Sequence, residues 1–151
     1  MTRRVADTMK LRTRVETMVA IAVLGLAGCG EDATSPEDLL EGGVLATFQV
    51  SQEEFSVWVT NEATIQQIFD LRDGTSTANI PNGKLHQGAG LGDHNDPWTW
   101  YLDPVDIEMA DLTIEVCDGR PSLVDDLLPD YLTVGRFCPW GAELVRVEDF
   151  R

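Results

Sequence analysis

Four side chains near the middle of the chain have the types and the spacing for metal-assisted chemistry. Asp93, His94 and Asp96 follow a run of glycines, and His86 precedes that run. Carboxylate oxygens on a flexible loop are ligands that Ca²⁺ prefers, whereas two imidazoles suit a transition metal. A metal-dependent hydrolase that uses these residues is therefore one hypothesis for the function.

The same segment is also typical of a simple turn. Aspartate, asparagine and glycine ahead of a proline are residues that tight turns use. The order of oxygen ligands of an EF-hand, which ends in a glutamate, is missing from the sequence. We therefore predict a mobile loop over residues 87–96, without a metal ion or another cofactor, and the first place to look for a ligand site.

Sequence signatures of other enzyme classes are missing as well. No serine lies in a Gly-x-Ser-x-Gly context, and neither a P-loop nor a GxGxxG motif occurs. A catalytic Cys–His pair is available in principle, but we expect the candidate cysteines to be oxidised. The sequence thus predicts a protein that is not an enzyme.

The first 28 residues have the order of an export signal. A basic region precedes an apolar run at residues 18–27, which is too short to span a membrane as a helix. The sequence LAGC at residues 26–29 then resembles the lipobox of bacterial lipoproteins, in which the cysteine is lipidated and becomes the first mature residue. We predict a signal peptide at residues 1–28 and a lipid anchor at Cys29 in the bacterial cell envelope, and Gly30 favours the outer membrane. The alternative is ordinary signal cleavage beside an unmodified cysteine.

Negative charge is concentrated after the leader. The whole chain carries a formal net charge of -15, and residues 1–28 hold five basic and two acidic side chains. The remainder holds 6 basic and 24 acidic side chains, a net charge of about -18. Such a surface repels phosphate backbones and argues against nucleic-acid binding, while a cationic partner or Ca²⁺ stays open. Residues 29–43 are rich in acidic residues, Ser, Thr, Pro and Gly and are predicted to form a disordered tether.

Two cysteines, Cys117 and Cys138, remain in the mature part. An even pair in an exported chain is the context in which disulfides persist. Closing a loop of about 22 residues would stabilise the fold by roughly 3 kcal/mol. A metal pair or a reactive thiol is the alternative, although no CxxC motif or nearby histidine supports a zinc site. We predict a disulfide between the two.

The start of the domain has the pattern of a hairpin followed by a helix. Hydrophobic and polar residues alternate over residues 44–50 and 55–60, with a turn near Ser51. Asn61 can cap a helix of about eleven residues, and Gly74 supplies its left-handed stop. These elements predict two strands and one helix packed on them.

Residues 98–103 and 112–117 also alternate with period two and predict two further strands. Trp98 and Trp100 fall on one face of the first of them, and we expect both rings in the core because large rings dominate small cores. Trp58 and Tyr101 are the aromatic residues that we expect to be exposed and able to contact a protein or carbohydrate ligand.

A second helix is expected from Pro121, with Ser122 and Asp125 as a capping box and Pro129 at its end. The last predicted strand covers residues 143–147. Together the elements predict a single α+β domain over residues 44–151. It would have a small antiparallel sheet of about five strands, two helices packed on one face and one closing disulfide.

The order of residues from 46 to 147 resembles the amino-terminal domain of the binding-protein-seventy-four group, which is associated with calmodulin-binding proteins and with exported bacterial proteins. The blocks that carry the resemblance are ATF at residues 46–48, IQQ at 65–67, PWTWYLDP at 97–104, IEVCDG at 114–119, PSLV at 121–124, FCPW at 137–140 and LV at 144–145. The resemblance implies a shared fold and supports pairing Cys117 with Cys138. It implies no catalytic residues, and calmodulin binding is not carried over because no basic amphipathic helix follows the domain.

The preferred function is a lipid-anchored, exported binding or interaction module without catalytic activity. Its candidate ligand contacts are Trp58, Tyr101, Asp93, His94 and Asp96. The alternatives are the metal-dependent hydrolase with His86 in its site, and a protease inhibitor that presents a rigid loop between residues 130 and 140.

Overall fold

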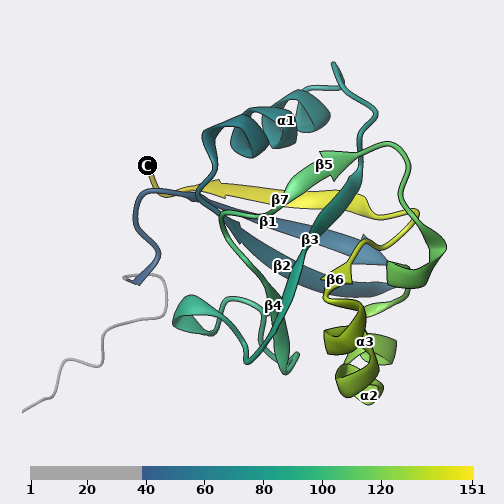
Figure 1. Cartoon of the computed structure of the whole chain (residues 1–151). Coiled ribbons are helices and arrows are strands. Elements are labelled where there is room, and N and C mark those ends of the chain that lie inside the picture. Colours follow the sequence, from purple (N-terminus) through teal and green to yellow (C-terminus); the bar gives the residue numbers. More distant parts are fainter. Residues whose placement is uncertain (1–38) are drawn as a thin grey trace, which may run out of the picture. The chain divides into compact units, whose positions relative to one another are not determined.

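A computed structural model describes residues 39–151 of the chain (Figure 1). The predicted signal peptide, the lipid anchor at Cys29 and most of the predicted tether lie outside these residues. The described residues all belong to one compact unit. No helix within them combines the length and the apolar character needed to cross a bilayer.

Three antiparallel strands form the first sheet, in the order β2-β1-β7. They are β1 (Val44–Val50), β2 (Glu53–Val59) and β7 (Glu143–Asp149). Val50 pairs with Glu53, so only Ser51 and Gln52 form the turn between β1 and β2. Both have a positive φ, 52° and 71°, as a two-residue hairpin turn requires. The predicted hairpin and the last strand are confirmed.

The second sheet is built around β3 (Ile80–Gln87), which pairs with three short antiparallel strands. These are β4 (Trp100–Leu102), β5 (Glu108–Ala110) and β6 (Arg136–Phe137). β5 pairs with the start of β3, β6 with its middle and β4 with its end. The prediction of one sheet of about five strands is therefore wrong. The strand predicted over residues 112–117 is also wrong, because β5 ends before it.

The hydrophobic core lies between the two sheets. Phe55 of β2 contacts Trp100 of β4 and Phe137 of β6, with ring centroids 5.8 Å and 5.6 Å apart. Trp100 and Phe137 are 5.0 Å apart, and all three side chains are buried. Aromatic rings at these separations add to the burial of apolar area, and the predicted core position of Trp100 is confirmed.

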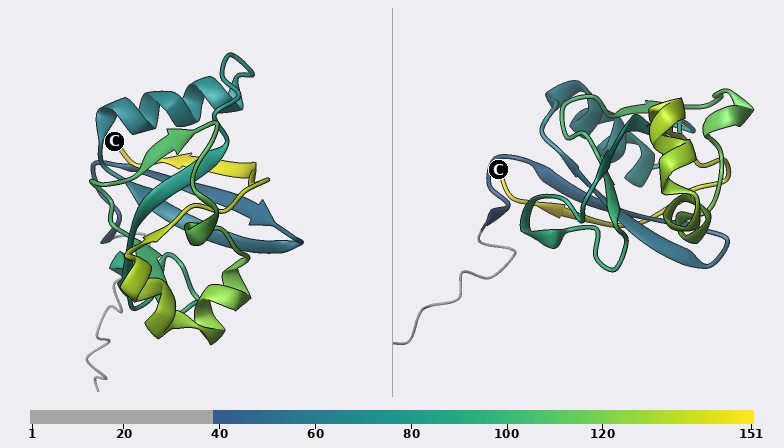
Figure 2. Two further views of the ribbon diagram at one scale, coloured as in Figure 1. Left: turned by 45° about the vertical axis from the view of Figure 1, so that its right-hand side comes forward. Right: turned by 60° about the horizontal axis from the view of Figure 1, so that its bottom comes forward.

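The helices lie at opposite ends of the sheets rather than on one face (Figures 1 and 2). They are α1 (Glu62–Arg72), α2 (Pro121–Asp126) and α3 (Leu128–Val134). The Asn61 side chain caps α1 by accepting from the N–H groups of Ala63 and Thr64, as predicted. The Thr64 hydroxyl donates to the carbonyl of Ile107, which ties α1 to the chain entering β5.

The predicted capping box of the second helix is wrong. The N–H and the hydroxyl of Ser122 both donate to the carboxylate of Glu53, at 2.8 Å each. Asp125 instead accepts from Thr99, at 2.8 Å from its N–H and 2.7 Å from its hydroxyl. Pro129 lies in the first turn of α3 and does not end the second helix, because α2 already ends at Asp126. A carboxylate thus links α2 to β2 of the first sheet, and another links α2 to the residue just before β4 of the second.

Candidate functional site

The predicted loop at residues 87–96 is held by a buried asparagine. Asn95 is 1 % exposed. Its Oδ1 accepts from the N–H of Ser56 at 2.8 Å, and its Nδ2 donates to the carbonyl of Trp100 at 2.7 Å. Buried backbone groups need such partners, so this side chain joins β2 of the first sheet to β4 of the second.

His94 packs into the same loop. Its Nδ1 lies 3.0 Å from the carbonyl oxygen of Leu91, and its buried Nε2 has no hydrogen-bond partner within residues 39–151. Burial lowers the pKa of His94, against smaller opposing effects of the Leu91 carbonyl and Asp93. Gly90, at a φ of 85°, leaves room for the ring, because a Cβ at this position would overlap it.

His86 and His94 both contact the ring of Tyr101. The His86 ring stacks on Tyr101 at 5.3 Å, and the His94 ring meets it edge-on at 6.2 Å. His86 Nε2 lies 3.2 Å from Asp103 Oδ2. No three His, Cys, Asp or Glu side chains within residues 39–151 are placed to hold a metal ion.

The other predicted contact residues are scattered. Asp93 and Asp96 are exposed, whereas Trp58 is only 2 % exposed and packs edge-on against Phe150, with centroids 5.9 Å apart. The prediction of Trp58 as an exposed contact is therefore wrong. Its ring also lies against Gly43, where no Cβ would fit.

Three of the four most exposed large aliphatic side chains among residues 39–151 lie where a half-buried strand was predicted. Leu112, Ile114 and Val116 are 79 %, 68 % and 60 % exposed. Their segment leaves β5 and ends in a short 3-10 helix, η3 (Glu115–Cys117), on the side of the molecule between β5 and α2 (Figure 1). Large aliphatic side chains gathered at a surface mark a binding site more often than isolated ones do.

This exposed segment is braced along its length. Cys117 forms a disulfide with Cys138, with Cα atoms 5.2 Å apart, which confirms the predicted pairing. The Trp140 indole donates to the Thr113 hydroxyl at 2.6 Å. The Tyr131 hydroxyl of α3 donates to the Asp118 carbonyl, also at 2.6 Å. Burial raises the pKa of Tyr131.

A cavity of about 360 Å³, here called the disulfide groove, runs beside this segment. Its lining residues are Asn82, Glu108, Ala110, Leu112, Thr113, Ile114, Val116, Cys117, Val134 and Arg136. A smaller hollow of about 180 Å³ adjoins it between Val116 and α3. Arg136 is held at one side by Asp106, at 2.6 Å, and by Asn82, at 2.9 Å. Largely apolar walls with a few oriented polar groups are typical of ligand sites.

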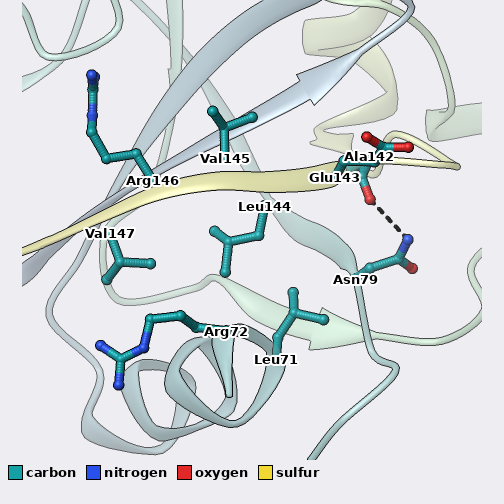
Figure 3. Close-up of a pocket in the computed structure, with 9 residues that line it drawn as sticks. All are labelled: Leu71, Arg72, Asn79, Ala142, Glu143, Leu144, Val145, Arg146 and Val147. Atoms are coloured by element: carbon teal, nitrogen blue, oxygen red, sulfur yellow. Dashed lines mark hydrogen bonds between the residues drawn. The ribbon is translucent and has the colours of Figure 1, made fainter. Parts of the chain in front are cut away.

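A second groove of about 460 Å³ lies between α1 and β7. Figure 3 shows Leu144 and Val147 pointing from β7 toward the end of α1, while Val145 and Arg146 point away. A register shift in the β1–β7 pairing explains why these last two neighbours share a side.

The second groove is the weaker candidate. Its apolar residues Leu71, Leu144 and Val147 are packed against the core. Its cations are already paired, Arg72 with Asp73 and Arg146 with Glu148, at 2.8 Å each. The disulfide groove, in contrast, presents aliphatic side chains that nothing within residues 39–151 covers.

Sequence reasoning missed the disulfide groove because it assigned the alternating residues 112–117 to a buried strand face. Alternation shows that Leu112, Ile114 and Val116 share a side, but not whether that side is buried. Asp111 and Glu115 fall on the opposite side of the alternation, as they would in a half-buried strand, so no local signal separated the two cases.

Comparison with known protein families confirms the resemblance found in the sequence. Residues 43–151, well over half of the chain, match the family model of the binding-protein-seventy-four N-terminal domain. No curated protein and no solved structure matches the chain.

Proposed function

The chain belongs to the binding-protein-seventy-four N-terminal domain family, and we propose that it is a non-catalytic binding module whose ligand enters the disulfide groove. One observation carries the proposal: Leu112, Ile114 and Val116 are 60–79 % exposed on a segment that is braced by a disulfide. Exposed aliphatic area favours association once a ligand covers it. A segment that is already ordered loses little further entropy on binding.

The proposed setting is the outside of a bacterial cell. An export leader followed by a lipobox supports lipidation at Cys29, and a lipid anchor would hold the domain at the envelope membrane through residues 29–43. The Cys117–Cys138 disulfide supports an oxidising compartment.

The two alternative functions draw less support. A hydrolase would need the side chains of residues 86–96 to converge, but Asn95 and His94 are occupied in holding their own loop. An inhibitor loop would need residues 130–140 to protrude. Most of this stretch instead forms α3 and β6.

The test uses a neutral apolar dye, N-phenylnaphthylamine, whose fluorescence rises in apolar surroundings. The protein would be the chain from residue 30 onward, which contains the whole compact unit. We expect the double variant L112S/I114S to bind the dye at least about tenfold more weakly, because each buried aliphatic side chain contributes roughly 1.5–3 kcal/mol.

The matched control is V105S, because Val105 is 65 % exposed and lines another hollow. It should bind the dye as the wild type does. All three proteins should unfold at similar temperatures, since the changed side chains are exposed. Equal dye binding by L112S/I114S and the wild type would contradict the proposed function.

A further inference from the structure

Acidic side chains lie in and near the disulfide groove. Glu108 lines it, Asp130 lines the adjoining hollow, and Asp111 and Glu115 are chain neighbours of the exposed aliphatic residues. All four are exposed. None of them forms an ion pair with a cation among residues 39–151.

The single cation of the groove offers these carboxylates no compensation. Arg136 Nη1 lies 2.6 Å from Asp106 Oδ2, and its Nε donates to Asn82 Oδ1 at 2.9 Å. Its charge is therefore directed at a carboxylate outside the groove. The four exposed carboxylates Glu108, Asp111, Glu115 and Asp130, here called the rim, therefore have no ion-pair partner among residues 39–151.

We propose that the partner is a cationic amphipathic polypeptide segment, an inference that rests on the proposed function. Its apolar side chains would cover Leu112, Ile114 and Val116, while its lysines or arginines would meet the carboxylates of the rim. Complementary charge speeds encounter and selects partners, and apolar contact supplies the affinity.

Other occupants of the groove fit its charge less well. A fatty acid, an anionic lipid or a nucleic acid would bring negative charge to a negative rim. A second copy of this chain would bring the same rim and a formal net charge of -15. A cationic segment would reduce the repulsion among the carboxylates of the rim, whereas each of these anionic occupants would increase it.

The experiment compares two peptides by fluorescence anisotropy with the chain from residue 30 onward. The first is an amphipathic Leu/Lys helix of about eighteen residues, or five helical turns. The second has Glu in place of every Lys. We expect the cationic peptide to bind at least about tenfold more tightly than its anionic twin, and added salt to reduce this difference.

Two variants with the same net charge locate the effect on the surface. The rim variant removes the four charges of the groove: E108Q, D111N, E115Q and D130N. The control removes four exposed carboxylates elsewhere: E41Q, E54Q, D93N and D96N. We expect the rim variant to lose about tenfold in affinity for the cationic peptide, and the control to lose clearly less.

The possible results distinguish a failure of this inference from a failure of the proposed function. If the twin peptides bind equally and both lose affinity in L112S/I114S, the groove is a binding site and only the cationic partner is wrong. If L112S/I114S binds the cationic peptide as the wild type does but binds the dye more weakly, the cationic partner is wrong and the groove remains a binding site. If the variant binds both the peptide and the dye as the wild type does, both proposals are wrong. Binding to phosphatidylcholine vesicles through Leu112 and Ile114, without peptide binding, would identify a lipid surface instead and overturn the inference.

Discussion

Asn95 shows how a single side chain can connect two sheets. Its amide accepts from the N–H of Ser56 and donates to the carbonyl of Trp100, at 2.8 Å and 2.7 Å. From the sequence, residues 93–96 favour turn chemistry, with metal ligation as the alternative. The position of β2 beside β4 shows that Asn95 has a structural role, because its side chain bonds to both strands.

The lowered pKa of His94 should make the free energy of unfolding depend on pH. Burial lowers its pKa in the folded state below the ordinary value of 6.5. The unfolded chain therefore binds more protons below about pH 6.5, and the free energy of unfolding should fall as the pH falls through this window. Urea unfolding at about pH 7, 6 and 5 would measure it, above the range in which most carboxylates titrate.

The control for this prediction is the variant H94Q, which keeps a polar side chain of similar size but cannot titrate. Its free energy of unfolding should depend less steeply on pH between about 6.5 and 5 than that of the wild type. An identical slope in the two proteins would show that His94 takes up its proton equally well in both states.

At the scale of elements, the disulfide is expected to hold one particular segment. It closes a loop with a sequence separation of 21 between Cys117 and Cys138. The variant C117A/C138A should lose about 3 kcal/mol in free energy of unfolding, the loop-closure value for this length. Urea denaturation of the oxidised wild type and the variant would measure the difference.

The variant C117A/C138A should also show which segment becomes less stable without the disulfide. Hydrogen exchange is expected to speed up over residues 110–118, next to the disulfide groove, while the amides of the β1–β2 hairpin stay protected. An unchanged exchange rate in that segment would mean that Thr113, Asp118 and their hydrogen bonds hold it without the disulfide.

Elements with local signals were predictable from the sequence. Asn61 and Gly74 delimit α1 because capping and the left-handed stop depend only on neighbouring residues. The β1–β2 hairpin needs only alternation and a short turn. Ser122 was misassigned because its partner, Glu53, lies in a distant hairpin, and no local pattern announces such a contact.

The division into two sheets was beyond local patterns for the same reason. β4 lies within the strand predicted over residues 98–103, but β5 and β6 are three and two residues long, too short for alternation to distinguish them from loops. Each of the three short strands is defined by its pairing with a different part of β3. The exposed run at residues 112–117 has the clearer alternation and is not a strand.

At the scale of the whole molecule, the acidic surface and the predicted lipid anchor are compatible with the same proposed function. A domain with a strongly negative net charge stays soluble and resists self-association, and lipid chains at Cys29 would confine it to a membrane. A ligand would then have to come to the envelope, and a cationic one would be attracted to it.

The anchor makes a prediction for the full chain expressed in a bacterium with a lipoprotein pathway. The wild type should be recovered with membranes and incorporate a labelled fatty acid, because Cys29 follows a lipobox. The variant C29S should incorporate no label and leave the membrane fraction. Label in C29S, or wild type that remains unlabelled, would refute lipidation at this cysteine.

The disulfide groove is the central claim, and methyl NMR tests it most directly. N-phenylnaphthylamine would be titrated into the methyl-labelled chain from residue 30 onward. The account predicts that the methyl signals of Leu112, Ile114 and Val116 shift progressively with dye concentration, while those of Val105 and Val145, which are also exposed, stay in place. Shifts confined to Leu144 and Val147, in the groove between α1 and β7, or no shifts at all, would contradict it.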